Sequence, residues 1–514
     1  MRGQGKLLGA FLTVGGWTMA SRILGFVRDL FLAAFLGAGA LAEAFQAAFA
    51  LPNLFRRFFA EGAFNLAFVP IYSKKVQSGE DPEGFSSNAL SALAGILILL
   101  TLLAQLIMPV LIYMMASGFA GDARFDLSVM LGRIIFPYVL FISLAAVFSG
   151  MLNARGHFAV AAAAPVLLNI ILIAAMMLSY VSNLDIGQAL SWGVLIAGVA
   201  QMGLVYWAIH RLGIRIQWRL PVINDDLKRL LKIALPALLT GGVIQINLLI
   251  GRQVASHFEG AYAWLYYADR LYQLPLGVVG IAIGIVLLPS LSRALAEADD
   301  VAGQNAFNRS MEFALVLTLP CAIALIVIPL PLVSVLFERG AFSFTDSRAT
   351  AAALAIYGLG LPAFVGQKVV QPLYFAREDT QTPFRYALVA MLVNAVLAIG
   401  LSFFVGYLAA AIGTTISAWA MLGLLWWNSR DLGAAAEIDA ALARKSWRIF
   451  AASLAMGFVL YLFNSFASDY FYTGGLRYIA MALAVGLGGS SYFAFLILFR
   501  AMRVTELRSF LKRS

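Results

Sequence analysis

Cysteine, histidine and charged side chains are scarce in this chain of 514 residues. The single cysteine, Cys321, excludes a disulfide within the chain and a metal site built from paired cysteines. The three histidines do not form a His-Glu-x-x-His motif, which excludes a zinc-peptidase helix of that type. Charged residues make up only 12% of the chain, whereas soluble proteins contain about 25%. We therefore expect no metal ion, no cofactor and a chain that resides in a lipid bilayer.

Long hydrophobic runs are what the chain has instead, since 62% of its residues are hydrophobic. Runs of about 20 apolar residues, separated by loops with charges, glycine or proline, predict about fourteen transmembrane helices. They span residues 7–36, 41–72, 88–116, 127–152, 158–181, 186–210, 229–255, 261–294, 308–337, 348–375, 383–404, 406–428, 446–466 and 475–500. The predicted fold class is an all-α polytopic membrane protein. In the ninth segment, Pro320, Pro329 and Pro331 predict a kink.

The net charge of +10 is compatible with nucleic-acid binding or with the cytoplasmic loops of a membrane protein. The distribution of the charge favours the second interpretation. Lys and Arg concentrate in the loops that follow even-numbered segments, and most strongly between residues 211 and 232. Because such loops face the cytoplasm, we expect both termini to be cytoplasmic.

Two halves of the sequence resemble each other. FVPIYSK, ending at Lys74, returns as LLPSLSR, ending at Arg293. NARGHF followed by PVLLNIILIA, from Asn153, returns as FARED followed by AMLVNAVLAI, from Phe375. Both pairs are offset by about 220 residues, or about six helices, which predicts parallel repeats of the kind found in transporters.

The repeat defines the predicted domains. The first lobe spans residues 1–212, an amphipathic linker on the cytoplasmic surface spans 213–228, and the second lobe spans 229–430. Residues 431–514 contain two helices outside the repeat and a basic tail. Since transporters of this construction bind their substrates between repeats, we expect the functional site to use residues from both lobes.

Ionisable residues inside the hydrophobic segments are the candidates for that site. An arginine at bilayer depth costs roughly 2.5–3.5 kcal/mol, so these side chains are expected to face a water-filled cavity or to pair with carboxylates. The candidate substrate-binding residues are Arg22, Arg28, Asp29, Arg56, Arg57, Glu61, Asp269 and Arg270. Arginine binds phosphate oxygens through two parallel hydrogen bonds and stays charged, so this set is typical of a phosphate-ester site.

A second interpretation of the same residues remains open. The pairs Arg28–Asp29, Arg57–Glu61 and Asp269–Arg270 could be structural ion pairs that hold helices together. The set contains more arginines than carboxylates, which favours binding of an anion over complete internal pairing.

Three motifs resemble one family. SRILGFVRD, ALPNLFRRFFAEGAFNLAFVPIYSK and YYADRLYQLPLGVVGIAIGIVLLPSLSR are similar to the MurJ/MviN family of lipid II flippases, within the multidrug/oligosaccharidyl-lipid/polysaccharide (MOP) exporter superfamily. The resemblance implies a cationic cavity between two six-helix lobes and a groove for the undecaprenyl tail formed by the last two helices. The essential arginines of the family correspond to Arg22, Arg28, Arg56 and Arg270, and acidic positions of the family correspond to Asp29 and Glu43.

The function implied by the resemblance is translocation of lipid II across the bacterial inner membrane by alternating access, without catalysis. The implied partners are lipid II, whose pyrophosphate the cavity binds, membrane lipids and peptidoglycan synthesis proteins, but no nucleic acid. Some family members bind sodium through carboxylates on the seventh and eleventh helices. This chain offers Gln245, Asn247 and Asn394 there, so we do not expect a sodium site.

Two alternatives remain beside this function. Export of another polyprenyl-linked glycan or of an amphipathic drug would use the same architecture, although a drug site for cations should be acidic or aromatic. A membrane glycosyltransferase would need a catalytic carboxylate in a loop facing one leaflet. The outer loops, which contain Glu43 and residues 122–126, offer no convincing pair of carboxylates.

Overall fold

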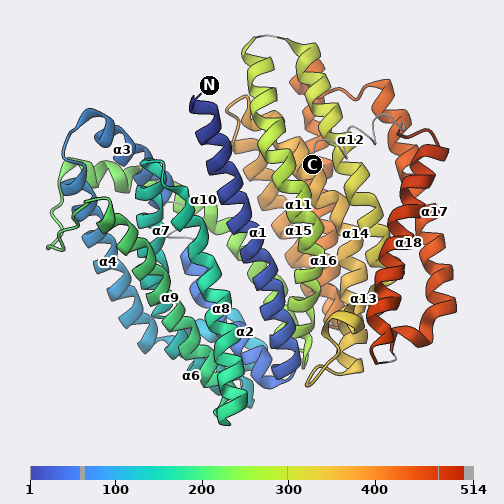
Figure 1. The fold of residues 1–514 in the computed structure, drawn as a ribbon, viewed down its shortest axis with the longest axis horizontal. Coiled ribbons are helices and arrows are strands. Elements are labelled where there is room, and N and C mark those ends of the chain that lie inside the picture. Colours follow the sequence, from blue (N-terminus) through green and yellow to red (C-terminus); the bar gives the residue numbers. More distant parts are fainter. Residues whose placement is uncertain (1, 58–63, 298, 473, 503–514) are drawn as a thin grey trace. The chain divides into compact units, whose positions relative to one another are not determined.

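The computed structural model describes residues 2–57, 64–297, 299–472 and 474–502, and these parts of the chain are helical with short connections (Figure 1). The chain forms two compact units, Met1–Ala263 and Trp264–Ser514. Glu61 and the basic tail beyond residue 502 lie outside the described residues. The predicted all-α class is confirmed.

The first unit contains the helices from α1 to α10. They are α1 (Arg2–Leu36), α2 (Ala40–Arg56), α3 (Phe64–Ser78), α4 (Pro82–Leu106), α5 (Met108–Met115), the 3-10 turn η2 (Ser117–Phe119), α6 (Ala123–Ile135), α7 (Tyr138–Ala154), α8 (Phe158–Ser182), α9 (Ile186–Arg211) and α10 (Asp225–Ser256). Within this unit α1 packs along α8, while α9 packs against both α7 and α8.

The second unit begins within α11. Its helices are α11 (Ala261–Ala296), α12 (Asp300–Val327), α13 (Pro329–Phe337), α14 (Phe344–Phe375), α15 (Gln381–Val405), α16 (Leu408–Ser429), the 3-10 turns η3 (Arg430–Leu432) and η4 (Ala434–Ala436), α17 (Ala440–Phe471) and α18 (Leu476–Leu498). Here α16 packs against α14 and α15, and α17 packs against α12 and α18.

Each predicted membrane segment coincides with one helix or with a consecutive pair of helices. By length and composition, 9 helices of the described chain can cross a membrane, or up to 10 when α6 and α7, bent by 41°, count as one span. The helices outside this set include α1, α2 and α11, which carry the candidate arginines. Helix α2, with 17 residues, is shorter than any of these nine helices.

Two breaks in helices lie at related positions of the repeat. The kink predicted in the ninth segment is present, because α12 ends at Val327 and α13 starts at Pro329 after Ile328, whose φ is −125° and ψ is 44°. The first unit has an equivalent break at Ile107, just before α5, which the sequence analysis missed. Proline is tolerated in the first turn of a helix, whereas in a helix interior it removes a backbone hydrogen bond and favours a kink or a break. The two breaks are about 220 residues apart, as the repeat requires.

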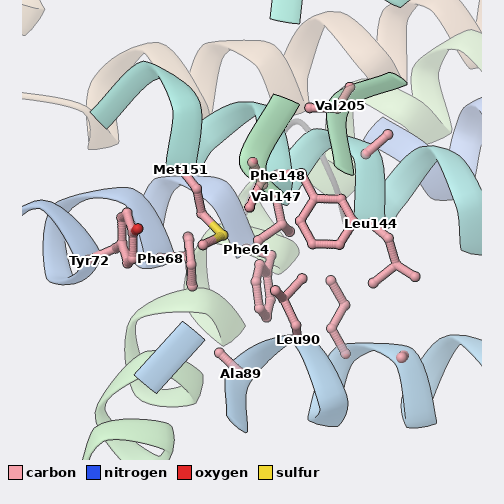
Figure 2. Packing of buried hydrophobic residues seen from close by; sticks show 14 of the residues in the cluster. Phe64, Phe68, Tyr72, Ala89, Leu90, Leu144, Val147, Phe148, Met151 and Val205 are labelled. Atoms are coloured by element: carbon pink, nitrogen blue, oxygen red, sulfur yellow. The ribbon is translucent and has the colours of Figure 1, made fainter. Parts of the chain in front are cut away.

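An aromatic core holds α3 and α4 against α7. Phe64, Phe68 and Tyr72 project from α3 toward Phe148 and other buried side chains of α7 (Figure 2). The ring centroids of Phe68 and Tyr72 are 5.5 Å apart. Stacked and offset aromatic pairs contribute about 0.5–1.5 kcal/mol beyond their burial. This core fixes the position of α7, whose C-terminal end reaches the candidate site.

The linker between α9 and α10 has no regular secondary structure from residue 214 to 224, and it contacts α4. The backbone nitrogen of Val222 donates to Asn88 Oδ1 over 2.7 Å, and Asn88 Nδ2 donates to the carbonyl of Val222 over 2.8 Å. Ser87 accepts a third backbone hydrogen bond from Gln217. Side chains of α4 thus replace the hydrogen bonds that a helix would have supplied.

Helix α10 belongs to the first compact unit, although the predicted second lobe begins at residue 229. Near the C-terminal end of α10, Gln253 Oε1 accepts a hydrogen bond from the backbone of Ser117, and the hydroxyl of Ser256 accepts one from Gly118. These bonds attach α10 to η2. The compact units therefore divide after Ala263, whereas the division of the predicted lobes at residue 229 stays a prediction from the sequence repeat.

Candidate functional site

Arg22 lines a cavity of about 480 Å³ between α1, α7 and α8 in the first unit. Its neighbours on α1 are Val14, Thr18 and Ser21, which share one face because they follow helical spacing. The side chain of Arg22 is exposed, and no hydrogen bond or ion pair joins its guanidinium to another residue of the described chain. The cavity thus presents one uncompensated positive charge.

Arg28 and Asp29 form a buried pair instead of facing open space. Arg28 is 7% exposed and Asp29 is 3% exposed. Arg28 Nη2 lies 2.8 Å from Asp29 Oδ1, and Arg28 Nη1 donates to Asn169 Oδ1 on α8 over 3.0 Å. This is the structural ion pair of the second interpretation. Asn169 adds a neutral hydrogen-bond acceptor to this ion pair.

Asn169 also determines which face of α1 meets α8. Its Nδ2 donates to the backbone carbonyl of Ser21 over 3.0 Å, and its amide lies 3.7 Å from the position of a Cβ added at Gly25. Ser21, Gly25 and Arg28 are therefore held on one side of α1. The adjacent face, with Thr18 and Arg22, is then directed at the cavity.

The role of Asn169 was missed from the sequence. Its signal was present, because a polar amide in the apolar run PVLLNIILIA needs a partner in a membrane helix. The partner lies 141 residues away, so the spacing along one helix does not reveal it.

Arg56 and Arg57 lie at the C-terminal end of α2. Arg56 is partly buried and Arg57 is exposed. Neither is among the described residues that line the Arg22 cavity. Their expected neighbour Glu61 lies outside the described residues, so their participation in a common site stays a prediction.

Asp269 and Arg270 lie in α11, in the second unit. The guanidinium of Arg270 stacks 4.6 Å from the ring centre of Tyr266 and donates to the Tyr266 hydroxyl over 3.2 Å. Asp269 accepts a short hydrogen bond from Gln273 one helical turn later. Stacking on an aromatic face orients a guanidinium while leaving donors for a ligand. The meeting of arginines from both lobes remains a prediction.

Glu43 is buried in a network of its own. Its Oε2 lies 2.9 Å from Nη1 of Arg124 on α6, and its Oε1 accepts the backbone N–H of Tyr262 over 3.0 Å. Arg124 Nη2 also contacts Asp122 Oδ2 at 2.6 Å, and these hydrogen bonds hold the pKa of Asp122 below its usual value. The network is fully internal to the unit. It connects the ends of α2, α6 and α11, and Glu43 itself is 0% exposed.

Comparisons with known proteins agree with this architecture. A sequence model described as lipid II flippase MurJ matches residues 32–481. A Rhizobium tropici protein named probable lipid II flippase MurJ is 49% identical over 77% of this chain and 75% of its own length. The lipid II flippase MurJ of Burkholderia cenocepacia is 36% identical over 76% of this chain and 77% of its own.

Solved structures give the same result for the fold. The structure of a lipid II flippase MurJ in an inward closed conformation superposes with a TM-score of 0.81 at 27% identity, covering 95% of this chain and 98% of that one. An inward-facing MATE multidrug transporter of the MOP superfamily shares the fold with a TM-score of 0.66 at 15% identity, covering 82% and 98%. Sequence and fold lead to one assignment: the chain belongs to the MurJ family of lipid II flippases.

Proposed function

We infer that this protein is a flippase that translocates lipid II across the membrane by alternating access. The observation that supports this function most strongly is the exposed Arg22, which lines a cavity in a chain whose relatives are named lipid II flippases. Lipid II carries a diphosphate between its lipid and its sugars, and guanidinium is the side-chain group best matched to phosphate oxygens.

The candidate residues divide into two roles within this proposal. Arg22 binds the diphosphate directly, because its guanidinium is open to the cavity. Arg28, held by Asp29 and Asn169, keeps α1 in the orientation that aims Arg22. Arg56, Arg57, Glu61, Asp269 and Arg270 complete the substrate-binding set on the strength of the family resemblance. Binding of an anion reduces repulsion among these arginines and favours the closed state over the open one.

The membrane location follows from the same reasoning. We place the protein in the bacterial inner membrane with both termini in the cytoplasm, because Lys and Arg concentrate in the loops after even-numbered segments. The chain acts as a transporter and not as an enzyme, and its further partners are membrane lipids and proteins of peptidoglycan synthesis.

The lipid tail is assigned to the surface of α17 and α18. Ile449, Met456 and Leu460 of α17 pack with Tyr492 and other residues of α18, which leaves the opposite faces of both helices outward. Large apolar side chains cover those faces, and Phe466 is 84% exposed. In a bilayer such surfaces contact acyl chains, so a polyprenyl chain can remain in the membrane while the headgroup moves.

Transport by reconstituted protein tests the proposal. Proteoliposomes with fluorescent lipid II are probed with a membrane-impermeant quencher, which reports the fraction of lipid II in each leaflet. We expect the Arg22→Ala variant to translocate at least about tenfold more slowly, because it loses a charge-assisted phosphate contact of about 1.5–3 kcal/mol. Arg133→Ala, which removes an exposed arginine from α6 outside the cavity, is the matched control and should leave the rate unchanged.

Two outcomes would contradict the proposal. One is that the wild-type protein translocates no lipid II although it is correctly folded. The other is that another polyprenyl-linked glycan is translocated while lipid II is not, which would favour the alternative export function.

A further inference from the structure

The Arg22 cavity contains more hydrogen-bonding groups than a diphosphate requires. Beside Arg22 it is lined by Thr18, Ser21 and Ser149, which carry hydroxyl groups, and by Asn153, which carries an amide. Ser149 donates to the carbonyl of Ala145 over 2.8 Å, so its oxygen remains an acceptor. One cation surrounded by neutral donors and acceptors matches a ligand that has both a charged and an uncharged polar part.

The size of the cavity supports the same kind of ligand. Its volume of about 480 Å³ lies inside the range of about 300–1,000 Å³ that is typical of sites for small organic ligands. Phe158 and Pro165 add apolar surface on the α8 side. A sugar ring beside a diphosphate can contact the charged, the uncharged polar and the apolar surface of the cavity.

Asn153 lines this cavity and has a well-defined backbone position. It lies in the last turn of α7, and its backbone carbonyl accepts a hydrogen bond from Gly156 over 3.0 Å. The next turn is anchored by Arg155, whose Nε donates to the Tyr72 hydroxyl over 3.1 Å. The side-chain amide of Asn153 is exposed and makes no hydrogen bond within the described chain. A rigid backbone therefore presents an amide with free donors and a free acceptor.

The second repeat shows that the turn does not need this amide. The sequence FARED places Phe375 where NARGHF has Asn153. The backbone hydrogen bonds agree, since Glu378 N donates to the carbonyl of Phe375 over 3.0 Å, as Gly156 N does to Asn153. Because the same turn forms with a phenylalanine, the amide of Asn153 is not required for the fold and is available for a ligand.

We propose that the cavity binds the sugar 1-diphosphate part of the substrate, with Arg22 on the phosphates and the Asn153 amide on the polar groups of the first sugar. This assignment rests on the proposed function and specifies which part of the headgroup the first unit holds. Asn153 is then a specificity residue. It distinguishes a glycosylated diphosphate from a bare one, because an amide both donates to and accepts from sugar hydroxyl and acetamido groups.

The test compares two soluble probes, N-acetylmuramic acid 1-diphosphate and inorganic pyrophosphate, in calorimetric binding to the purified full-length protein. We expect the wild-type protein to prefer the sugar diphosphate. Asn153→Phe and Asn153→Leu should weaken binding of the sugar diphosphate about tenfold and leave pyrophosphate binding unchanged. Arg22→Gln should weaken both probes. Phe375→Asn, the reverse change in the second repeat, is the matched control and should alter neither.

The outcomes separate this assignment from the proposed function. Equal affinity of both Asn153 variants and the wild-type protein for the sugar diphosphate would overturn the assignment, as would an equal loss for both probes. If the wild-type protein translocates lipid II but shows no preference for the sugar diphosphate, the assignment fails and the function stands. If the preference is present without any translocation, the function fails. Melting temperatures of the variants identify misfolding, and two different substitutions at residue 153 guard against it.

Discussion

The turn after α7 and the turn after α14 share backbone hydrogen bonds but differ in several side chains. In the first turn His157 N donates to the carbonyl of Leu152 over 2.9 Å, and in the second Asp379 N donates to the carbonyl of Tyr374 over 3.1 Å. The side chain that precedes the turn nevertheless differs, because the first unit has the polar Asn153 where the second has the apolar Phe375. Duplication has kept the geometry of this turn, while its chemistry is free to differ between the two units.

Asn169 on α8 and Asn394 on α15 occupy equivalent positions of the repeat and also differ in their contacts. Asn169 binds Arg28 and the backbone of α1. Asn394 is 1% exposed, and its Oδ1 lies 2.7 Å from the position of a Cβ added at Gly413 on α16. One asparagine therefore orients a neighbouring helix through a charged group, whereas the other lies in a close contact between helices. In the first unit the asparagine at this repeat position orients α1 toward the candidate site, whereas in the second unit it packs between helices.

Removing the amide of Asn169 should have the largest effect of the changes we consider. Asn169→Leu deletes the acceptor of Arg28 Nη1 and the donor to Ser21, so a buried guanidinium loses one of its hydrogen bonds. We expect a loss of about 2–3 kcal/mol in the free energy of unfolding, measured by thermal denaturation in detergent, together with a loss of translocation. The substitution also removes the hydrogen bonds that fix the orientation of α1 about its own axis. A cysteine at position 22 should therefore react with a water-soluble maleimide at a changed rate in the Asn169→Leu background.

An unchanged unfolding temperature and an unchanged rate of modification at position 22 would show that Asn169 does not orient α1. Cys321 is replaced by alanine in both backgrounds, so that position 22 carries the only thiol.

Gly25 lies near Asn169 and Gly413 lies near Asn394, so substitutions of these glycines test how the two asparagines differ. A Cβ at Gly413 would lie 2.7 Å from Asn394 Oδ1 and 3.0 Å from the backbone nitrogen of Ala398, and the latter cannot move away. A Cβ at Gly25 would lie 3.7 Å from Asn169, which is an ordinary contact. Gly413→Ala should therefore cost about 1–3 kcal/mol of stability. Gly25→Ala should change it by less than about 0.5 kcal/mol or raise it slightly, since alanine favours helix. Similar melting temperatures for the two variants would contradict this distinction.

The sequence predicted the fold better than it predicted the contacts of the site. Apolar runs and their spacing determine where membrane helices form, so the helical segments and a kink in the ninth segment were predicted correctly. The break at Ile107 was missed although Pro109 follows it, because one proline is a weaker signal than two. Packing of α10 with the first unit depends on Gln253 and Ser256, whose partners are far away in the chain.

The sequence predicted the candidate site only in part, because the deciding contacts again join residues that are far apart in the chain. An arginine in an apolar segment signals a site or an ion pair, and the sequence cannot choose between them until the neighbours of the helix are known. The structure places Arg22 in a cavity and Arg28 in a buried pair, although both lie in one helix and only six residues separate them. What distinguishes them is Asn169 on another helix. Asn153 carries no signal of its own, because a polar residue at the end of a helix is common.

The left-handed residue of each turn gives a small predicted effect and tests whether the two turns are equivalent. Gly156 has a φ of +80°, and Glu378 occupies the same place with a φ of +60°. Only glycine adopts this region without a steric penalty from Cβ. Glu378→Gly should therefore raise the free energy of unfolding by about 0.5–1 kcal/mol, and Gly156→Ala should lower it by a similar amount, in thermal unfolding of the purified protein. Opposite signs at the two positions are required if the backbone of the turn is shared. A loss of stability in Glu378→Gly would mean that the glutamate side chain makes a contribution for which the first turn has no counterpart.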